Sequence, residues 1–440
     1  MDTINSFLWS ISTCLLIASG IYFAVKLDFL HLNLKKIFKC FMKDEKNKDG
    51  ISAFESLTVA LGGCIGVGSL AGIALAIYKG GVGVIFWIWL SCLLVAPNSL
   101  VENALAIIYQ KKNCKEYLGG PSHYIRNGLG YKKLALIYAF LVTIAYIFGF
   151  LTIQSNTIVK SFTNFFEIPA IFIGLLIGIL SFLIIRKGIK GIAKFSSILV
   201  PLMGIVYLLI ATLIVFKNLN LIPNLLINIF KEAFNFNALG WGLFSTILIG
   251  IQRGIFSSEA GTGTAAIASG SSSIDSPIKQ GLIQTLGVYF VTFIVCTSTA
   301  FIILTSDYNP LNYTDVNGIE ITQNALIYHL GSFGNIVLYF CIIAFSFSTI
   351  VSGYFYGETN MKFIFKNMND KHILLLQILT CLLLVVSSVL SPSILWDFVD
   401  ILTALLVIIN VYSIFSLRKD VIIEYMMYKR KCKDDRKRLG

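Results

Sequence analysis

The sequence predicts an all-α polytopic membrane protein, and its composition alone indicates this class. Of its 440 residues, 56% are hydrophobic and 13% are charged, and the mean hydropathy is +0.79. A water-soluble fold could not bury that much apolar surface. Apolar stretches of the length that a spanning helix requires, roughly 20 residues, alternate along the chain with short charged segments.

Eleven stretches are predicted to be transmembrane helices. The first begins with MDTINS and lacks the basic region and the cleavage site of a signal peptide, so it is interpreted as a retained helix. The second and the seventh are interrupted by glycine and polar residues, which indicates broken helices rather than tilt alone. The predicted spans cover residues 6–26, 52–78, 81–110, 133–160, 168–186, 191–216, 240–268, 280–305, 334–357, 372–391 and 394–418.

The basic residues predict the orientation of these spans, because Lys and Arg concentrate on cytoplasmic segments. With the N-terminus outside, 30 of the 35 Lys and Arg residues lie on the cytoplasmic side, 4 lie outside, and Arg253 lies within the seventh span. The 306–331 segment has neither Lys nor Arg and is predicted to be an outer loop. A missed span would invert every later loop, so this pattern supports the count of eleven. The expected location is the inner (plasma) membrane of a prokaryote, with a cytoplasmic C-terminus.

The net charge of +12 raises the question of a nucleic-acid partner, but its distribution favours the lipid bilayer instead. The C-terminal KRKCKDDRKR is predicted to anchor the chain to anionic headgroups. Residues 30–43 alternate Leu, Ile and Phe with Lys at helical spacing, which predicts an amphipathic helix at the interface. No nucleic-acid partner is expected. The nine scattered cysteines predict neither a disulfide framework nor a zinc site.

Glycine crowds the second predicted span where it should cross the centre of the bilayer. The glycines are Gly62, Gly63, Gly66, Gly68 and Gly72. One interpretation is close helix packing through small residues. The other is an unwound segment whose freed carbonyl and amide groups face a ligand, which is tolerated only where the backbone lines a cavity. We favour the second hypothesis.

The seventh predicted span is interrupted by Arg253, Ser257, Ser258 and Glu259. An intramembrane charge costs about 2.5–3.5 kcal/mol even on the lenient insertion scale. Arg253 and Glu259 are therefore expected to face protein or water. They could pair with each other, and a purely structural ion pair is the alternative to a functional role.

The two interruptions open two blocks of five spans, spans 2–6 and spans 7–11. Because five is odd, the second block enters the membrane from the opposite side, which predicts a 5+5 inverted repeat. Two broken helices at corresponding positions indicate a transport site near the midplane, and exposed helix amino ends favour a carboxylate there. The predicted units are an extra N-terminal helix with a basic segment (1–50), the first repeat (51–216), the second repeat with its connecting loop (217–418) and a basic cytoplasmic tail (419–440).

Three segments resemble the signature of the sodium:alanine symporter family of alanine/glycine carriers. They are GIFSSEAGTGTAA (254–266), SPIKQGLIQTLGV (276–288) and VCTSTAFIIL (295–304), and the resemblance extends over roughly 50–415. It implies a leucine-transporter-like core in spans 2–11, preceded by one extra helix. It also implies that a small amino-acid substrate, alanine or glycine, is carried with sodium as coupling ion and with no other cofactor. No oligomeric state is predicted.

The resemblance also implies positions for the ligands. Sodium would be bound by the carbonyl groups of Gly62, Ile65 and Phe345 and the hydroxyl groups of Ser348 and Thr349. The two hydroxyls could instead bond their own helix backbone, and Gln154 could be a buried amide that bridges helices. The residues expected to bind the substrate are Gly66, Val67, Gly68, Ser69, Gln154 and Ser258.

Several positions depart from the family pattern, and they lie where function is expected. Ser69 and Ser258 each replace an Asn, Val67 replaces a Thr, and Val291 replaces an Asp. Further departures are Ile409 for a Pro, and Asn98 and Ser99 for a Thr and a Lys. A pocket of different size or a changed sodium stoichiometry is therefore possible. Because Ser348 and Thr349 are retained, one sodium per substrate is expected.

Alternatives to sodium symport are a proton-coupled carrier or an exchanger on the same fold, and a non-transporting amino-acid sensor. The sensor is disfavoured because no soluble output domain is evident in the sequence. An enzyme is disfavoured because the sequence has no motif that places a nucleophile beside a base and no phosphate-binding GxxxxGK[ST] loop. The four histidines are predicted in loops or at interface ends.

Overall fold

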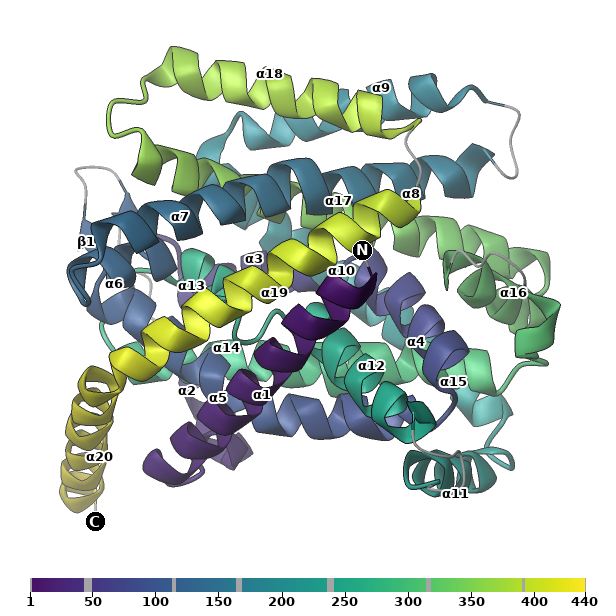
Figure 1. Cartoon of the computed structure of the whole chain (residues 1–440), viewed down its shortest axis with the longest axis horizontal. Coiled ribbons are helices and arrows are strands. Elements are labelled where there is room, and N and C mark those ends of the chain that lie inside the picture. The colour runs from purple at the N-terminus through teal and green to yellow at the C-terminus, as the bar shows by residue number, and fades with distance from the viewer. Residues whose placement is uncertain are drawn as a thin grey trace.

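The computed structural model describes residues 2–42, 50–112, 116–163, 168–235, 241–313, 318–389 and 392–439 (Figure 1). Almost all of its regular structure is helical, apart from one antiparallel pair of short strands. The elements up to residue 217 are α1 (Asp2–Lys26), η1 (Leu30–Leu32), α2 (Leu34–Met42), α3 (Ala53–Cys64), η2 (Gly68–Gly72), α4 (Ile73–Gly80), α5 (Val84–Ile108), β1 (Lys111–Lys112), β2 (Tyr117–Leu118), α6 (Pro121–Asn127), α7 (Lys132–Thr143), η3 (Ile144–Phe150), α8 (Leu151–Thr163), α9 (Ala170–Ile185) and α10 (Gly188–Lys217).

The remaining elements complete the second half of the chain. They are α11 (Ile222–Ala233), α12 (Trp241–Ser258), α13 (Thr264–Ser269), α14 (Pro277–Tyr289), η4 (Phe290–Cys296), α15 (Thr297–Leu304), η5 (Pro310–Asn312), α16 (Gly318–Leu330), α17 (Ser332–Ile364), α18 (Asp370–Ser387), α19 (Pro392–Ser416) and α20 (Arg418–Leu439). Of the η elements, η2, η3 and η4 are π-helical and η1 and η5 are 3-10 helices.

Each predicted span corresponds to a helix or to a run of helices. Eight helices of the described chain are long and apolar enough to cross a membrane, and the bent pair Ala53–Cys64 and Gly68–Gly80 makes a ninth. Helix α9 is apolar but shorter, and α12 and α13 lie on either side of the interruption in the seventh predicted span. The polytopic all-α class is confirmed, while the count of eleven spans stays a prediction.

The predicted limits lie within a few residues of most helices, and α17 is the main exception. This helix continues to Ile364, although the apolar pattern predicts its end at residue 357. The polar residues that end the apolar pattern, Glu358 and Lys362, form an ion pair of 2.7 Å one turn apart on this helix. Such a pair supports helix geometry where hydrophobic periodicity stops.

Helix α5 lies at the centre of the packing and contacts α12 and α14 of the second half. The N-terminal helix α1 packs along both α19 and α5, so it belongs to the bundle (Figure 1). Helices α9 and α18 lie side by side at one edge of the molecule (Figure 1). The two halves of the chain are therefore interleaved, and segments far apart in sequence meet in the interior.

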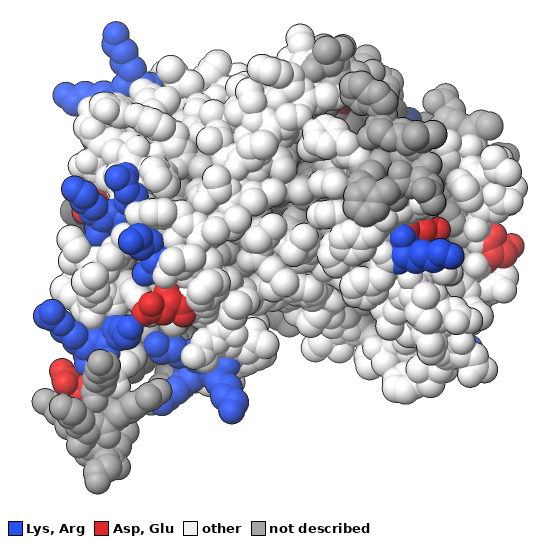
Figure 2. All heavy atoms as spheres, turned by 60° about the horizontal axis from the view of Figure 1, so that its bottom comes forward, with Lys and Arg blue, Asp and Glu red and all other residues white. Residues whose placement is uncertain are grey.

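The sides of the bundle expose apolar side chains. On α9, for example, Phe172 is 62% exposed and Leu176 and Ile179 are each 58% exposed. Figure 2 shows a broad face with few charged side chains, and most of the Lys and Arg residues in that view gather toward one end. This arrangement is expected for a helical bundle whose sides contact lipid and whose ends contact headgroups and water.

Two segments that were expected to be loops contain helices. Helix α16 lies within the predicted outer loop 306–331 and packs against α17 and η2. Its Thr322 hydroxyl lies 3.2 Å from the Leu70 carbonyl oxygen, so α16 covers one side of the broken second span. Helix α11 lies in the segment between the two predicted repeats and packs against α5. With 13 and 12 residues, these helices are too short for a criterion based on spanning length.

The amphipathic helix predicted for residues 30–43 is present as η1 and α2. Helix α2 buries Ile37 and Cys40 and exposes Lys35 and Lys39, so its two faces differ as the spacing predicts. The ammonium group of Lys36 lies 4.8 Å from the centre of the Tyr428 ring, which connects α2 with the C-terminal helix α20.

Two of the four histidines lie outside the spans, as predicted, but are buried. His31 lies in η1 and His123 in α6, where its ring packs 5.0 Å from that of Phe363. Burial lowers the pKa of His31 to about 4 and that of His123 to about 4. Both rings are consequently neutral at pH 7.

Candidate functional site

The second predicted span is broken between Cys64 and Gly68. Helix α3 ends at Cys64, Ile65 has the non-helical torsions φ −82° and ψ 72°, and the two half-helices are bent by 54°. The chain then resumes as the π-helix η2, a wide turn that is frequent at functional sites. The interruption predicted from the glycine cluster is thus observed in this segment, which we call the first break (residues 65–67).

Gln154 of α8 binds the backbone of the first break. Its Oε1 atom accepts a hydrogen bond of 3.1 Å from the Val67 N–H group. A Cβ atom on Gly66 would lie 3.1 Å from the Gln154 amide and only 2.6 Å from Thr349 Oγ1, so glycine is required there. Gln154 bridges two helices, and it also lies among the residues expected to bind the substrate.

The residues expected to bind sodium meet where α3 faces α17. Thr349 Oγ1 lies 2.9 Å and Ser348 Oγ lies 3.2 Å from the carbonyl oxygen of Gly62. The same hydroxyls lie 3.1 Å and 2.8 Å from the Phe345 carbonyl oxygen on their own helix. The four groups form an oxygen cluster between the helices, which we call the cage (Gly62, Phe345, Ser348 and Thr349). Ile65 lies at the adjacent C-terminal cap of α3.

The hydroxyls of Ser348 and Thr349 therefore do both things that the sequence allowed: they bond their own helix, and they lie at the expected sodium site. They bond backward to their own helix, as Ser and Thr commonly do, and they also reach across to α3. Ser352, one turn further along α17, lies beside the cage, because its Oγ would be 2.8 Å from a Cβ atom on Gly62. That hydroxyl is buried and has no hydrogen-bond partner, and sequence reasoning did not identify it.

The other residues expected to bind the substrate lie around the first break and are buried. Ser69 Oγ has no hydrogen-bond partner, and Ser258 Oγ lies 3.4 Å from the Ala260 backbone nitrogen. Gly68 faces an aromatic side chain, since a Cβ atom there would lie 3.0 Å from the Phe256 ring.

Phe256 is part of an aromatic stack that sequence reasoning did not identify. Its ring stacks on Phe150 at 5.3 Å and lies 5.4 Å from Trp396. These three rings come from η3, α12 and α19. They place a rigid apolar wall next to Gly68 and limit the space available there.

The seventh predicted span is broken between Ser258 and Thr264. Glu259, Gly261 and Gly263 have φ values of 51°, 83° and 85°, in the left-handed region that favours glycine. A helix cannot continue through three such residues, so α12 ends and the short helix α13 begins after a turn. We call residues 259–263 the second break.

Buried polar side chains satisfy the backbone of the second break. Glu102 of α5 accepts a 3.3 Å hydrogen bond from the Gly261 N–H group. Asn410 of α19 donates to Glu102 at 2.7 Å and to the Gly261 carbonyl oxygen at 2.9 Å. The Tyr138 hydroxyl donates to the Thr262 carbonyl oxygen at 2.6 Å. Three helices therefore hold this turn in place.

The two breaks lie next to each other. The Cys64 thiol, at the end of α3, lies 3.5 Å from the carbonyl oxygen of Ser258, at the end of α12. The ends of two half-helices from different halves of the sequence thus meet in the interior, as expected for a site at the centre of an inverted repeat.

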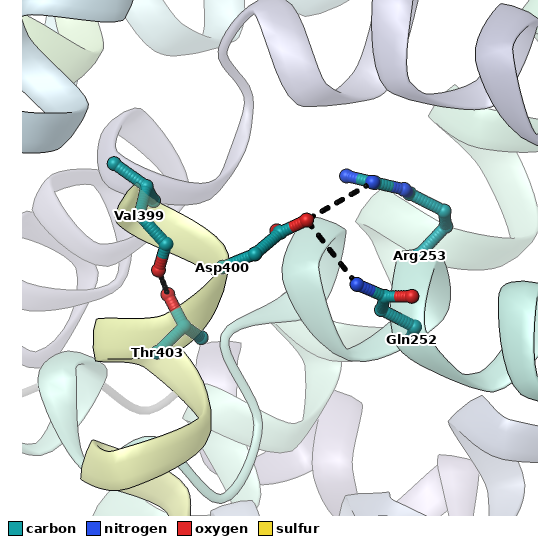
Figure 3. Close-up of polar contacts among 5 residues, drawn as sticks. All are labelled: Gln252, Arg253, Val399, Asp400 and Thr403. Atoms are coloured by element: carbon teal, nitrogen blue, oxygen red, sulfur yellow. Dashed lines mark hydrogen bonds and ion pairs between the residues drawn. The ribbon is translucent and has the colours of Figure 1, made fainter. Parts of the chain in front are cut away.

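Arg253 pairs with Asp400 and not with Glu259 (Figure 3). Its Nη2 atom lies 3.3 Å from Asp400 Oδ2, which also accepts a 3.2 Å hydrogen bond from Gln252. The guanidinium lies 5.6 Å from the rings of Phe256 and Trp396. The pairing between Arg253 and Glu259 that the sequence left open is therefore wrong.

Comparison with known proteins identifies the family. The sequence model of the sodium:alanine symporter family matches residues 1–439. The chain belongs to this family. Among its relatives, the probable sodium/glutamine symporter GlnT of Bacillus subtilis is 36% identical over 98% of this chain and 90% of GlnT. The sodium/alanine symporter AgcS of Methanococcus maripaludis is 30% identical over 99% of this chain and 98% of AgcS.

The fold of this sodium:alanine symporter family member is shared with solved transporter structures. MhsT, crystallised in complex with L-phenylalanine, matches with a TM-score of 0.62 over 84% of this chain and 89% of MhsT, at 16% identity. This similarity supports the leucine-transporter-like fold. Because the family consists of transporters, the prediction that the chain is not an enzyme is confirmed.

The structure adds groups to the site of this symporter-family protein that its sequence indicated only weakly. Glu102, Asn410 and Asp400 are polar residues within apolar stretches, and they also match the pattern of the family that the sequence resembles, which marks them as functional or structural candidates. Their partners depend on contacts between distant segments, such as the 147 residues that separate Arg253 from Asp400. Phe256 carries no such signal, because an aromatic residue is ordinary in a spanning helix.

The ion pair between Arg253 and Asp400 leads to a stability prediction. In Arg253→Met, Asp400 remains buried without its basic partner, and we expect the free energy of unfolding to fall by about 3–5 kcal/mol. The double variant Arg253→Met, Asp400→Asn is expected to lose less than the sum of the two single variants. Denaturant unfolding in detergent, followed by tryptophan fluorescence, measures these differences.

A matched control for that experiment is Lys429→Met. Lys429 lies 2.7 Å from Asp28, but both side chains are more than half exposed. Its removal should change the free energy of unfolding by less than about 1 kcal/mol. Additive losses at Arg253 and Asp400 would contradict a coupled pair.

Proposed function

We propose that this chain imports a small neutral amino acid, alanine or glycine, together with sodium. The observation that carries the proposal is the cage, in which the Gly62 carbonyl, near the end of α3, faces the hydroxyls of Ser348 and Thr349 at 3.2 Å and 2.9 Å. Carbonyl and hydroxyl oxygens are the ligands that a hard monovalent cation prefers. The names of relatives such as AgcS, a sodium/alanine symporter, support the same ion.

The proposed substrate site is the space bordered by residues 66–69 and Ser258. The substrate carboxylate would meet backbone N–H groups of the first break, where the start of η2 favours a negative charge. The wall formed by Phe256 next to Gly68 supports a small side chain, because a bulky one would overlap the aromatic rings.

Sodium would couple to transport through the contact between α3 and α17. A cation bound to the Gly62 carbonyl and to both hydroxyls would hold the end of α3 against α17 more strongly than the present hydrogen bonds do. The first break also carries the proposed substrate contacts, so sodium would favour the conformation that binds the substrate, and the substrate would favour sodium in return.

The proposed topology follows from the charge distribution and the order of the helices. Eleven spans would place the N-terminus outside and the C-terminus in the cytoplasm of a prokaryotic inner membrane. The units would be the N-terminal helix and basic segment (1–50), two repeats of opposite orientation (51–216 and 217–418) and the basic tail (419–440). Interactions between this tail and anionic lipid would hold the cytoplasmic end at the bilayer surface.

The identity of the transported amino acid is the most specific part of the proposal. AgcS is named for alanine and GlnT for glutamine, and this chain is similar to both. Uptake of labelled alanine and glycine into proteoliposomes, driven by an inward sodium gradient and competed with glutamine, tests the assignment. We expect accumulation that requires sodium and little competition by glutamine. Uptake that is equal in potassium alone, or that depends only on counter-substrate inside the vesicle, would favour a proton-coupled carrier or an exchanger instead.

The cage leads to a prediction about sodium dependence. In the double variant Ser348→Ala, Thr349→Ala, the sodium concentration for half-maximal alanine uptake should rise by about tenfold or more, because two ligand oxygens are lost. The apparent affinity for alanine at saturating sodium should change little. Initial uptake rates over a sodium titration measure both quantities.

The control for the cage variant is Ser413→Ala. The Ser413 hydroxyl lies 2.7 Å from the Ile409 carbonyl oxygen of its own helix, outside the cage and both breaks. It should leave the sodium dependence unchanged. If the double variant behaves in the same way, then Ser348 and Thr349 only bond their own helix and the cage does not bind sodium.

The first break leads to a prediction about substrate binding. In Gly68→Leu, a side chain would begin 3.0 Å from the Phe256 ring and would fill the space proposed for the substrate. Uptake should be lost, while expression and gel-filtration behaviour remain normal. The control Gly72→Ala adds a methyl group that meets no other segment within 4 Å, and it should retain uptake. Wild-type alanine affinity in Gly68→Leu would exclude this location for the substrate.

A further inference from the structure

Glu259 is a buried carboxylate in an unfavourable backbone conformation. It is 2% exposed, and its φ of 51° places a non-glycine residue in the left-handed region, at the start of the second break. Such a conformation costs on the order of 1–3 kcal/mol and persists where the surroundings enforce it, often at functional sites. The turn fixes the direction of this side chain.

No basic side chain compensates the charge of Glu259 in the described structure. The ion pairs of the described residues join Arg253 to Asp400, Lys362 to Glu116 and Glu358, and Lys429 to Asp28. A carboxylate buried at membrane depth is costly unless a cation balances it. Glu102, the other carboxylate at the second break, has hydrogen bonds from Gly261 and Asn410 instead.

The groups around Glu259 are mainly oxygen atoms. Thr264 Oγ1 lies 2.7 Å from Glu259 Oε2 and 2.7 Å from Thr262 Oγ1. The Tyr146 hydroxyl of η3 also interacts with the Glu259 carboxylate. Carboxylate and hydroxyl oxygens together form a donor set that suits a hard cation.

The hydroxyl of Tyr356 supplies an independent observation. Tyr356 of α17 is fully buried, and its hydroxyl has no hydrogen-bond partner. This oxygen would lie 3.0 Å from a Cβ atom on Gly63, next to Cys64, which contacts the carbonyl oxygen of Ser258. The Tyr356 ring packs edge-on against Tyr146 at 5.0 Å. The unpartnered hydroxyl is thus directed toward the region where the two breaks meet.

We propose that Glu259 is the centre of a second sodium site, with the hydroxyls of Thr264 and Tyr356 as further ligands. The inference deepens the proposed function and rests on it, because it assumes sodium as the coupling ion. It differs from the single sodium per substrate expected from the retained Ser348 and Thr349. The site is separate from the cage, since it joins the second break to the end of α3, whereas the cage joins α3 to α17.

The donor set distinguishes sodium from other cations. No group of three or more His, Cys, Asp and Glu side chains that could hold a metal ion occurs in the part of the chain that the structure describes, which disfavours transition metals. A single carboxylate balances one positive charge. A proton on Glu259 would also balance it but would leave the Tyr356 hydroxyl without a partner, whereas a bound sodium ion would be coordinated by that oxygen.

The test measures the sodium-dependent thermal stability of purified full-length protein. Melting temperatures are compared in sodium chloride and in potassium chloride of equal concentration, over a range of pH. Three proteins are used: the wild type, Ser348→Ala with Thr349→Ala, and this double variant with Glu259→Gln added. We expect the double variant to retain part of the sodium-dependent rise in melting temperature and the triple variant to lose it.

Two further variants control for folding defects. Glu358→Gln changes a buried carboxylate that pairs with Lys362, outside both breaks and the cage, and should lower the melting temperature equally in both salts, which preserves the sodium-dependent difference. Tyr356→Phe removes only the unpartnered hydroxyl and should raise the sodium concentration for half-maximal stabilisation by roughly three- to tenfold. A Tyr356→Phe variant with wild-type sodium affinity would exclude that hydroxyl as a ligand and overturn the proposed site.

Each outcome separates the second site from the cage. A sodium effect that Ser348→Ala with Thr349→Ala removes completely would overturn the Glu259 site and leave the proposed symport intact. A residual effect that persists in the triple variant would also overturn it. If adding Glu259→Gln to the double variant removes only the pH dependence of the melting temperature and not its dependence on sodium, Glu259 binds a proton. The sodium assignment is then overturned. A wild-type protein insensitive to sodium would contradict both the second site and the proposed symport.

Discussion

Backbone that leaves helical geometry inside a bilayer must still have its N–H and C=O groups satisfied, and the rest of this structure depends on that constraint. At the first break, Gln154 accepts from the Val67 N–H group, and near the end of α3 Thr349 reaches the Gly62 carbonyl oxygen. At the second break, Glu102 and Asn410 bind both backbone groups of Gly261. Gln154, Glu102 and Asn410, which are polar residues in otherwise apolar helices, are thus explained by the backbone that they satisfy.

The same constraint connects structure with transport. A backbone group that is hydrogen-bonded only within its own helix has no second partner nearby. A carbonyl such as that of Gly62, in contrast, can accept a hydrogen bond from a hydroxyl or bind a cation. The hydroxyl of Ser348 can likewise donate to that carbonyl or offer its lone pairs to an ion. At the proposed cage, binding of an ion would exchange hydrogen bonds for ligand bonds without leaving a buried group unsatisfied. Such an exchange would let an ion stabilise one packing of α3 against α17 and so favour one conformation of the transporter.

The sequence predicted the class of the protein, both breaks and most helix limits, because these depend on local apolar length and on glycine and polar residues within it. It did not predict α16, which is too short for a span and yet covers η2, next to the first break, through the contact of Thr322 with Leu70. The partner of Arg253 could not be assigned either, since Asp400 lies 147 residues further along the chain, on α19, and meets it only in the folded structure (Figure 3). The convergence of Ser348 and Thr349 on Gly62 was expected from a family resemblance, and spacing alone would not have placed α17 against α3.

Hydrogen–deuterium exchange in sodium and in potassium tests most directly whether a cation ties the first break to α17. Backbone amides at a break exchange quickly when the partners that satisfy them open and slowly when those partners are held. Exchange of the peptide that covers residues 62–69 is expected to be slower in sodium than in potassium, with peptides of α20, which packs against α5, α14 and α19, unchanged. Equal exchange of residues 62–69 in the two salts would contradict the claim that sodium binds between α3 and α17.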